Sequence, residues 1–398
     1  METTPQPETT DPTGAGSSQP PIAAWLADPS ARPRVLLLFG GRSGEHAISC
    51  ATAGGVLRAI DRAKYDVVAV GITPAGKWVL VEDDPDLWSI VDGRLPEVQD
   101  GPAHVLLPQS TDARGLQVIA PDSLPVAIGR VDVVFPLLHG PFGEDGTVQG
   151  MLELVDLRYV GAGVLASAVG MDKHFMKLVL AAQGIPVAPF VVLHPGDFER
   201  SPAVWTETIA ALGLPVFVKP ARAGSSLGIS KVSSLDELPA AITEAQRHDP
   251  KVIVEVGVVG REIECAVLGA REGERARASQ PGEIVVTSSE HGFYDFEAKY
   301  LDERSVVLTC PADLPADVIE VVRDLAVRTF EAVGCEGLAR VDVFVTADQD
   351  VIVNEINTMP GFTPFSMYPR MWQESGIAYP DLIDELLQLA LTRRIGLR

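Results

Sequence analysis

The stretch from Gly337 to Gly361 constrains the fold of this chain more than any other part of the sequence. Two runs of β-branched and other apolar residues, 341–345 and 351–356, lie on either side of the short polar segment 347–350. Such runs, separated by so short a segment, predict an antiparallel hairpin. The sequence therefore places this hairpin in a buried sheet.

Polar side chains interrupt the apolar hairpin at regular spacing. Because side chains alternate faces along a strand, Arg340 and Asp342 share one face of the first strand, and Glu355 and Asn357 share one face of the second. Two carboxylates and an amide oxygen that face one space suit a hard divalent cation such as Mg²⁺. The alternative is a salt-bridged pair of strands anchored by Arg340, because buried charges need partners. These residues by themselves leave both interpretations open.

Composition limits the function classes. With 398 residues, 46% of them hydrophobic, the chain is long enough to bury the cores of two to three domains. It has 32 Lys and Arg against 54 Asp and Glu, a formal charge of -22, and no basic run. We therefore expect no nucleic-acid partner and no membrane partner, and an anionic ligand would need locally placed cations. The four cysteines form no C-x-x-C pair, which favours a reducing compartment.

Residues 1–31 are rich in Pro, Thr, Ser and Gly, with almost no large apolar residue before Ile22. This composition predicts a disordered arm. The apolar patch at 22–27 is too short for a signal sequence or a membrane span, so we expect a cytoplasmic protein.

An α/β domain is predicted from Arg34 onward. The apolar run 35–41 ends in glycines and precedes a predicted helix over 45–60, and further strands are predicted over 65–72 and 131–138. A strand, a glycine turn and a helix N-terminus together form an anion site. A dinucleotide is one candidate ligand, although the G-x-G-x-x-G spacing is absent. The segment 78–120 is predicted to be a less regular insertion of unknown role.

His139 follows the third predicted strand, at the edge where open α/β sheets bind ligands. A structural, hydrogen-bonded histidine is the alternative.

A second region begins near Ala168. A predicted amphipathic helix starts at Met171, and 214–232 is predicted as strand, small-residue loop and strand. The backbone of the loop at Ser225 and Ser226 can contact phosphates, with Lys219 as a nearby charge. A plain flexible hairpin is the alternative, since the Walker A order is absent.

Two further strand-like runs lie within 251–270 and carry Glu255 and Glu262. These carboxylates are candidate acceptors for an adenine and a ribose. The alternative is that they are exposed strand glutamates.

Seven motifs follow one another along the chain: GGRSGEHAIS, HGPFGEDGTVQG, VGMDK, KPARAGSSLGISK, FYDFEAKY, GLARVDVF and NEINTMPGFTPFSMYP. In this order they resemble the motifs of D-alanine-D-alanine ligases of the ATP-grasp type, and the resemblance extends from Arg34 to the C-terminus. The resemblance implies an α/β fold in which an open α/β domain precedes a two-lobed ATP-grasp fold. The implied divisions are the arm 1–31, a substrate domain 32–168, a central lobe 169–255 and a C-terminal lobe 256–398 with the metal site and a lid at 288–300.

The resemblance also implies an activity: ATP-dependent joining of two D-alanine molecules through an acyl phosphate, giving ADP and phosphate, for peptidoglycan synthesis. The implied cofactors are ATP and two Mg²⁺ ions, with Mn²⁺ as a substitute, and the implied assembly is a homodimer. A ligase of the same fold that uses D-lactate and a non-catalytic nucleotide-binding module are the alternatives.

Residue roles implied by the resemblance fall into four groups. Metal ligands are Asp342, Glu355 and Asn357. Nucleotide contacts are Lys173, Lys219, Glu255, Glu262 and Lys299, beside the loop at Ser226. The catalytic group is the hydrogen-bonded trio Glu45, Ser225 and Tyr300, together with Arg340 and the N–H of Gly361. Substrate contacts are Glu45 and Arg340 for the first D-alanine, Ser366 and Met367 for the second, and His139 nearby.

Overall fold

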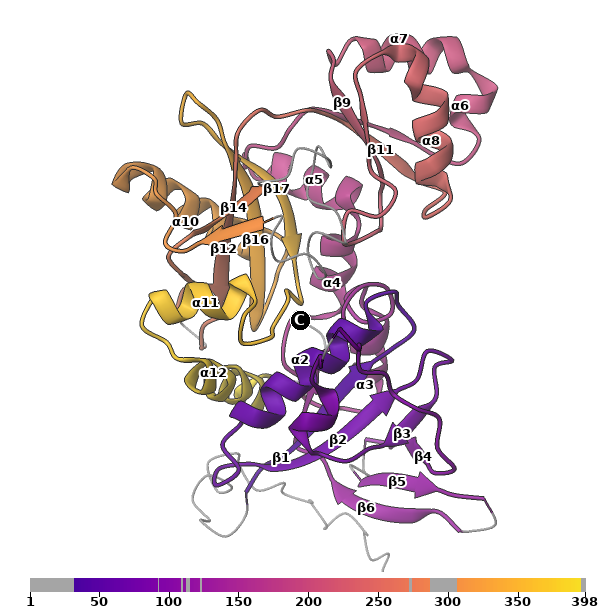
Figure 1. The fold of residues 1–398 in the computed structure, drawn as a ribbon, viewed down its shortest axis with the longest axis vertical. Coiled ribbons are helices and arrows are strands. Elements are labelled where there is room, and N and C mark those ends of the chain that lie inside the picture. The colour runs from indigo at the N-terminus through magenta and orange to yellow at the C-terminus, as the bar shows by residue number, and fades with distance from the viewer. Residues whose placement is uncertain are drawn as a thin grey trace, which may run out of the picture.

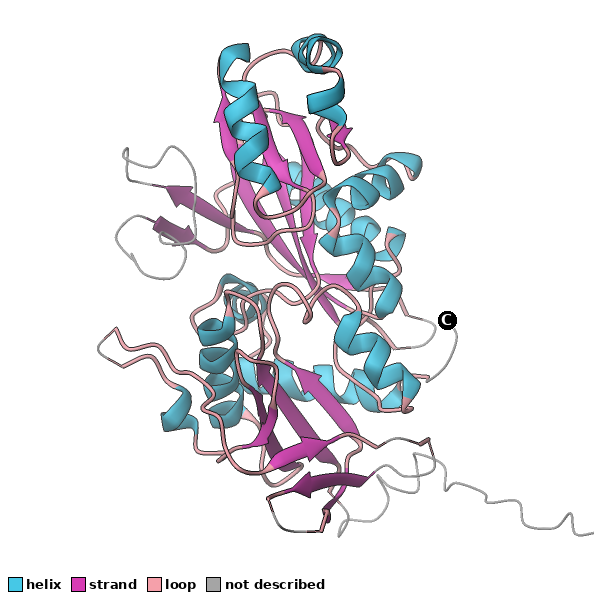
Figure 2. Cartoon of the chain, turned by 90° about the vertical axis from the view of Figure 1, so that its right-hand side faces the viewer, coloured by secondary structure: helices cyan, strands magenta, loops and turns pink. Residues whose placement is uncertain are grey.

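The structure is a computed structural model that describes residues 32–91, 93–108, 110–111, 115–121, 124–271, 274–286 and 306–394. Within it, three β-sheets form three bodies, which Figure 1 shows at the bottom, at the upper right and at the left, and Figure 2 shows from the side. The predicted arm, the lid at 288–300 and the residues Lys299 and Tyr300 lie outside the described residues.

The first sheet contains three parallel strands with β1 in the middle. They are β1 (Arg34–Gly40), β2 (Asp66–Ile72) and β7 (Val133–Pro136). Residues 35–39 of β1 are fully buried, because helices cover both faces of the sheet. Val35, Leu37 and Phe39 pack toward α2 (His46–Ala59), while Leu36 and Leu38 pack toward α3 (Thr147–Leu154). The predicted α/β start of the chain is confirmed.

The insertion at 78–120 differs from the prediction of an irregular segment. Its short strands, together with one that follows it at 126–130, continue the first sheet from the edge of β2 in antiparallel order, β2-β3-β4-β5-β6. They are β3 (Trp78–Leu80), β4 (His104–Leu106), β5 (Gly115–Ile119) and β6 (Val126–Arg130), with the 3-10 helix η1 (Pro85–Trp88) between β3 and β4. Strands of three to five residues carry too little alternation to be recognised from sequence, and their pairing with β2 decides their conformation.

The central sheet is antiparallel, with the order β10-β9-β11-β8. Its strands are β8 (Phe190–Leu193), β9 (Val216–Pro220), β10 (Ser230–Val232) and β11 (Val252–Val256). Two helices pack on one face of it, α7 (Pro202–Ala210) and α8 (Leu238–Gln246), and their apolar side chains share a core with the valines of β9 and β11. Short helices α6 (Asp197–Arg200) and η2 (Leu235–Glu237) complete this body. The predicted strand, loop and strand over 214–232 are present.

Helices α4 (Val164–Met171) and α5 (Lys173–Ala182) follow the first body: α4 lies next to it, and α5 lies between the central and third sheets (Figure 1). Asp172 caps α5 by accepting hydrogen bonds from the N–H groups of His174 and Phe175. This cap fixes the first turn of α5, which carries Lys173. The predicted domain boundaries stay predictions.

The third sheet contains the predicted hairpin, which the structure confirms as antiparallel strands β16 (Leu338–Val345) and β17 (Val351–Asn357). A shift in register between Asp342 and Val343 bends the pair. The remaining strands follow in the order β15-β14-β12-β16, with β13 beside β12, and α10 (Ala316–Ala332) covers one face. They are β12 (Arg261–Leu268), β13 (Arg277–Ala278), β14 (Gly282–Val286) and β15 (Val306–Thr309).

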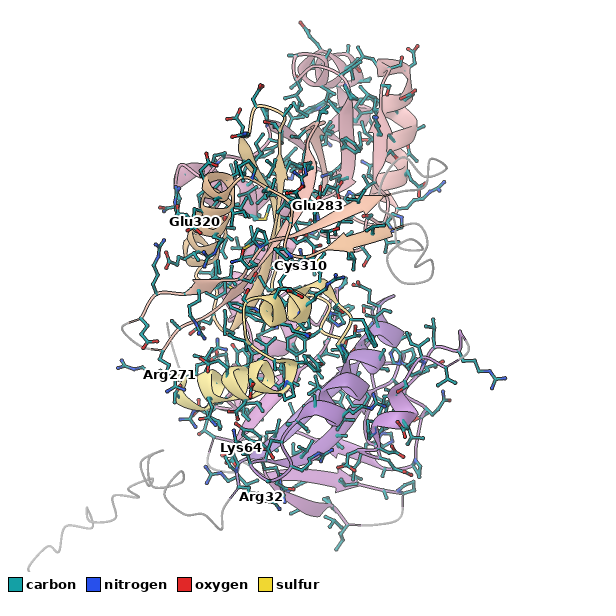
Figure 3. The ribbon with its side chains drawn as sticks, turned by 60° about the vertical axis from the view of Figure 1, so that its left-hand side comes forward. Arg32, Lys64, Arg271, Glu283, Cys310 and Glu320 are labelled. Atoms are coloured by element: carbon teal, nitrogen blue, oxygen red, sulfur yellow. The ribbon has the colours of Figure 1, made fainter. Side chains whose placement is uncertain are left out.

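The last two helices return the chain to the first body. They are α11 (Met367–Glu374) and α12 (Tyr379–Thr392), and apolar residues of α12 share a core with β1, β7 and α2. Lys64, labelled in Figure 3 near α12, pairs with Asp384 at 3.0 Å, and the Tyr65 hydroxyl donates to the same carboxylate. The N-terminal body is therefore held by the C-terminal end of the chain. None of the helices in the described ranges is long and apolar enough to cross a membrane.

Candidate active site

A cavity of about 540 Å³ lies where the three bodies meet. The loops at the carboxyl ends of β1 and β7 form one wall, and the small-residue loop after β9 forms another. The ends of β16 and β17, the segment 358–361 and the start of α11 form the rest. The cavity therefore collects residues from widely separated parts of the chain.

Glu45 enters this cavity from the turn that follows β1. Gly40 and Gly41 both adopt positive φ, a conformation that suits glycine, and Ser49 fixes the turn by bonding Gly40 N–H and the Leu137 carbonyl. Glu45 immediately precedes α2, and its carboxylate accepts a hydrogen bond from the Ser225 hydroxyl. The structure thus brings together two members of the predicted trio, and the third, Tyr300, lies outside the described residues.

The loop around Ser225 contacts the first body through Glu45 and contains two non-glycine residues with left-handed backbone. Ser225 and Ser226 have φ values of 51° and 57°. Lys173 donates to the Ala223 carbonyl at 2.9 Å, which fixes one side of the loop. Ala223, Gly224 and Ser225 line the cavity.

His139 is 5% exposed, and both of its ring nitrogens contact protein groups. Nδ1 lies 3.1 Å from the Met359 carbonyl, and Nε2 lies 3.2 Å from the Thr52 hydroxyl. Burial lowers the pKa of His139, and the nearby charge of Glu45 offsets this only in part. These contacts fit the structural alternative, in which His139 links the first body to the segment 358–361.

Glu144 lines the same cavity, from the turn between β7 and α3. Its Oε1 accepts a hydrogen bond from Gly140 N–H at 2.6 Å. Burial and the neighbouring Glu45 raise the pKa of Glu144 to about 8.

The polar face of the β16-β17 hairpin is a connected cluster. Arg340 makes two hydrogen bonds of 2.7 Å to Asp342 and one ion pair of 3.1 Å to Glu264. Burial alone would lower the pKa of Arg340, but Asp342 and Glu264 raise it well above its ordinary value. Asn357 donates to Asp342 at 3.0 Å, and Glu355, opposite Asp342 in the register, lies 3.3 Å from Lys173 Nζ. Arg340 therefore pairs with its own strand and with β12, and the side-chain contact between β16 and β17 in this cluster comes from Asn357. The metal assignment stays a prediction.

Sequence reasoning missed Glu264, although a signal was present. Glu264 lies two residues after Glu262 on β12, so both point to the same face of the strand. Glu264 is 4% exposed and lines the cavity, whereas Glu262 lies farther along the strand and is exposed.

A buried charge cluster lies at the base of the central sheet. Lys219 donates to Glu255 at 3.0 Å, and Lys177 Nζ lies 3.6 Å from the other oxygen of Glu255. Burial would raise the pKa of Glu255, but Lys219 and Lys177 lower it. Burial lowers the pKa of Lys177. The sequence analysis assigned no role to Lys177, the second of two lysines on α5, whereas it predicted Lys219 and Glu255 as nucleotide contacts.

The start of α11 closes the cavity. Ser366 precedes the helix, and its hydroxyl accepts a hydrogen bond from Thr363 N–H at 3.1 Å. Ser366 and Met367, which the resemblance assigns to the second substrate, and Gly361, which it assigns to catalysis, all line the cavity. The Met367 side chain is itself buried, so its backbone is the part suited to contact a substrate.

Comparison with known proteins identifies the fold class. A structure titled the D-alanine-D-alanine ligase from Coxiella burnetii matches with a TM-score of 0.75 and 36% identity, over 90% of this chain and 94% of that one. A structure titled VanG D-Ala:D-Ser ligase from Enterococcus faecalis matches with a TM-score of 0.77 and 35% identity, over 90% and 99%. The fold is that of the ATP-grasp ligases, as predicted.

Sequence comparison identifies the family within this fold class. Family models described as D-ala D-ala ligase N-terminus and D-ala D-ala ligase C-terminus match residues 34–162 and 179–388. A Pseudarthrobacter chlorophenolicus protein named D-alanine--D-alanine ligase is 58% identical over 92% of this chain and 96% of its own length. A Mycobacterium ulcerans protein of the same name is 54% identical over 92% and 98%. The chain belongs to the D-alanine-D-alanine ligase family.

Proposed function

We propose that this protein joins two D-alanine molecules to D-alanyl-D-alanine at the expense of ATP, through an acyl phosphate formed in the 540 Å³ cavity. Membership of the ligase family makes the protein an ATP-dependent ligase. The observation that carries the site assignment is the meeting of Glu45, Ser225 and Arg340 in one cavity. The product serves peptidoglycan synthesis.

The first step forms an acyl phosphate. A carboxylate oxygen of the first D-alanine attacks the γ-phosphorus of ATP, and the bond to ADP breaks. Glu45 would pair with the ammonium of this D-alanine, while Arg340 would hold its carboxyl group. Both side chains are held by protein partners before substrate binds, which limits the reorganisation that the reaction requires.

The second step forms the peptide bond. The amine of the second D-alanine attacks the acyl carbon, the tetrahedral intermediate expels phosphate, and the amine loses a proton. Arg340 and the N–H of Gly361 would stabilise the oxyanion. Ser366 and the start of α11 would bind the carboxylate of the second D-alanine.

The nucleotide would lie between the central and third sheets. Lys173, Lys219 and the loop at Ser226 would contact phosphates, and Glu255 and Glu262 would accept from adenine and ribose. Lys173 and Lys219 supply the local cations that a chain of charge -22 needs to hold an anion.

The hairpin cluster fits magnesium. Asp342 and Glu355 lie directly opposite each other, with Asn357 bonded to Asp342, so three side-chain oxygen donors meet on one face. Oxygen donors without nitrogen or sulfur are the set that Mg²⁺ takes, with phosphate oxygens completing its shell. Two Mg²⁺ ions, or Mn²⁺, held there would neutralise charge on the transferring phosphoryl group.

A test of the metal assignment uses Asp342→Asn and Glu355→Gln, which keep side-chain size and remove charge. Each lost electrostatic contact with the transition state costs on the order of 3 kcal/mol, so we expect kcat to fall at least about 100-fold. Asp348→Asn, at the exposed turn of the same hairpin, is the matched control. Wild-type turnover of either site variant at ordinary magnesium concentration would refute the assignment.

The acceptor is the part of the function that most needs a direct test, because one structural relative is titled a D-Ala:D-Ser ligase. We propose D-alanine as the acceptor. The experiment supplies D-alanine, D-serine and D-lactate at equal concentrations with ATP and identifies products by mass spectrometry, with L-alanine as a control. D-Alanyl-D-alanine should predominate, and a predominant depsipeptide or D-alanyl-D-serine would overturn the proposal.

Homodimer assembly and a cytoplasmic location are also proposed. The requirement for ATP supports a cytoplasmic location, as do the four cysteines, which are all free. Light scattering of the purified protein would test the dimer.

A further inference from the structure

A second cavity, of about 230 Å³, lies beside the two loops that carry Glu45 and His139. Residues 40–43 of the first loop and His139 and 141–143 of the second contribute to its lining, while Glu45, Gly140 and Glu144 line the substrate cavity. The two loops therefore separate the cavities, with His139 bordering both. The second cavity also lies at the carboxyl ends of β1, β2 and β7, the edge at which parallel sheets place ligands.

The walls of this cavity are mainly apolar and partly aromatic. Trp78 and Phe142 provide the two aromatic rings. The aliphatic walls come from the ends of two strands, the segment after β7 and one side of α3: Ile72, Leu138, Val148 and Met151. A planar apolar group of single-ring size suits such a space, because small-ligand sites are apolar with a few polar groups that fix orientation.

Arg42 is the one permanently charged residue among the described residues that line the cavity. Its guanidinium lies 4.6 Å from the centroid of the Phe142 ring, and its side-chain carbons pass close to Gly76. Within the described part of the chain, Arg42 forms no ion pair with a carboxylate, although the protein carries a large excess of acidic groups. A guanidinium that stacks on a ring still presents a planar fork of donors, which is suited to bind a carboxylate.

We infer that this second cavity is a regulatory site for a small carboxylic acid with an aromatic or branched apolar body. The apolar part lies between Trp78 and Phe142, and the carboxylate pairs with Arg42. A ligand of about 11 non-hydrogen atoms has an expected Kd on the order of 0.1 to 1 mM, given the usual affinity per atom.

Binding in this cavity acts on the substrate site through the shared loops. The Ser43 hydroxyl donates to the His139 carbonyl at 2.7 Å, which joins the loops. Phe142 has a φ of 70°, which is unusual for a bulky residue, so this loop is held in a strained conformation that a ligand can shift. Gly140 passes so close to the Glu45 carboxylate that a Cβ there would lie 2.7 Å from it. This effect on substrate affinity rests on the proposed function, whereas the binding site does not.

The direct test measures binding of 3-phenylpropionate to the full-length protein by titration calorimetry, without ATP or D-alanine. We expect saturable one-site binding in the range above, and at least about tenfold weaker binding of the neutral 3-phenylpropanamide. Arg42→Met, which keeps the side-chain packing, should weaken binding of the acid about tenfold. Met151→Trp, which fills the cavity, should abolish it, and Arg94→Met, at an exposed arginine elsewhere in the same body, should leave it unchanged.

Kinetics then test the coupling. In the wild type, 3-phenylpropionate should change KM for D-alanine, and the effect should disappear in Met151→Trp, whose basal activity is retained. Any of three results would overturn the inference: no saturable binding below about 10 mM, binding that neither Arg42→Met nor Met151→Trp changes, or displacement of the acid by D-alanine at the same site. Normal binding in a protein that makes no D-alanyl-D-alanine would instead refute the proposed function and leave the site standing.

Discussion

Glu144 gives the sharpest prediction for stability. Burial and Glu45 raise the pKa of Glu144 to about 8, far above the value near 4.5 of a glutamate in an unfolded chain. Between these values the folded protein holds a proton on Glu144 that the unfolded chain has released. Stability is therefore lost as pH rises from about 4.5 through about 8, because ionisation of Glu144 is disfavoured only in the folded state.

The size of this loss of stability follows from the shift in the pKa of Glu144. Each pKa unit corresponds to about 1.4 kcal/mol, so at pH 7.5 the full penalty is about 4 kcal/mol. The carboxyl group borders a water-accessible cavity, and screening reduces this to about 2 kcal/mol. Glu144→Gln removes the ionisation and keeps an oxygen that can accept from Gly140 N–H. The variant should therefore melt about 2 to 3 °C higher than the wild type at pH 7.5, because the entropy of unfolding of a 398-residue chain is large.

Scanning calorimetry of the ligand-free protein at pH 5.5 and pH 7.5 measures this difference. At pH 5.5 the gain should shrink to about a third, because the pH is only one unit above the unfolded value. Glu82→Gln, at a glutamate that lies outside the cavity in the same body, should show no such dependence. In a Glu45→Gln background the gain from Glu144→Gln should be smaller. A gain that is equal at both pH values would refute the reasoning.

Two further predictions concern buried groups. Ser49→Ala leaves Gly40 N–H and the Leu137 carbonyl without their buried partner. Because each unsatisfied buried group costs about 1 to 3 kcal/mol, the variant should lose about 2 to 4 kcal/mol of unfolding free energy. A fall in melting temperature of less than about 2 °C would contradict this. Lys177→Met removes a cation beside Glu255 and should raise KM for ATP at least about tenfold, with little change in KM for D-alanine. Steady-state kinetics measure both constants, with Lys177→Arg as the conservative comparison. Equal changes in the two KM values would contradict a role confined to the nucleotide pocket.

The sequence by itself determined the elements whose pattern is local and strong. The continuous apolar run of β1 is visible in the sequence as a strand that is buried on both faces. The alternation in β16 and β17 is visible because the strand period of two fixes which side chains share a face. The same alternation is sufficient to put Arg340 and Asp342 on one face of β16. The order of motifs along the chain was enough to indicate the family, because each motif is a local string of residues.

Only the tertiary structure decided which of these local elements meet. Glu45 and Ser225 are 180 residues apart, and their contact depends on how the central sheet faces the first. The strands β3 to β6 exist through pairing with the edge of β2, and α12 crosses back to the first sheet at the end of the chain. The raised pKa of Glu144 likewise arises from burial and from a neighbour that folding brings close. Local sequence encodes the period and direction of side chains, whereas contacts between distant segments depend on the packing of whole faces, and no short window of residues contains that information.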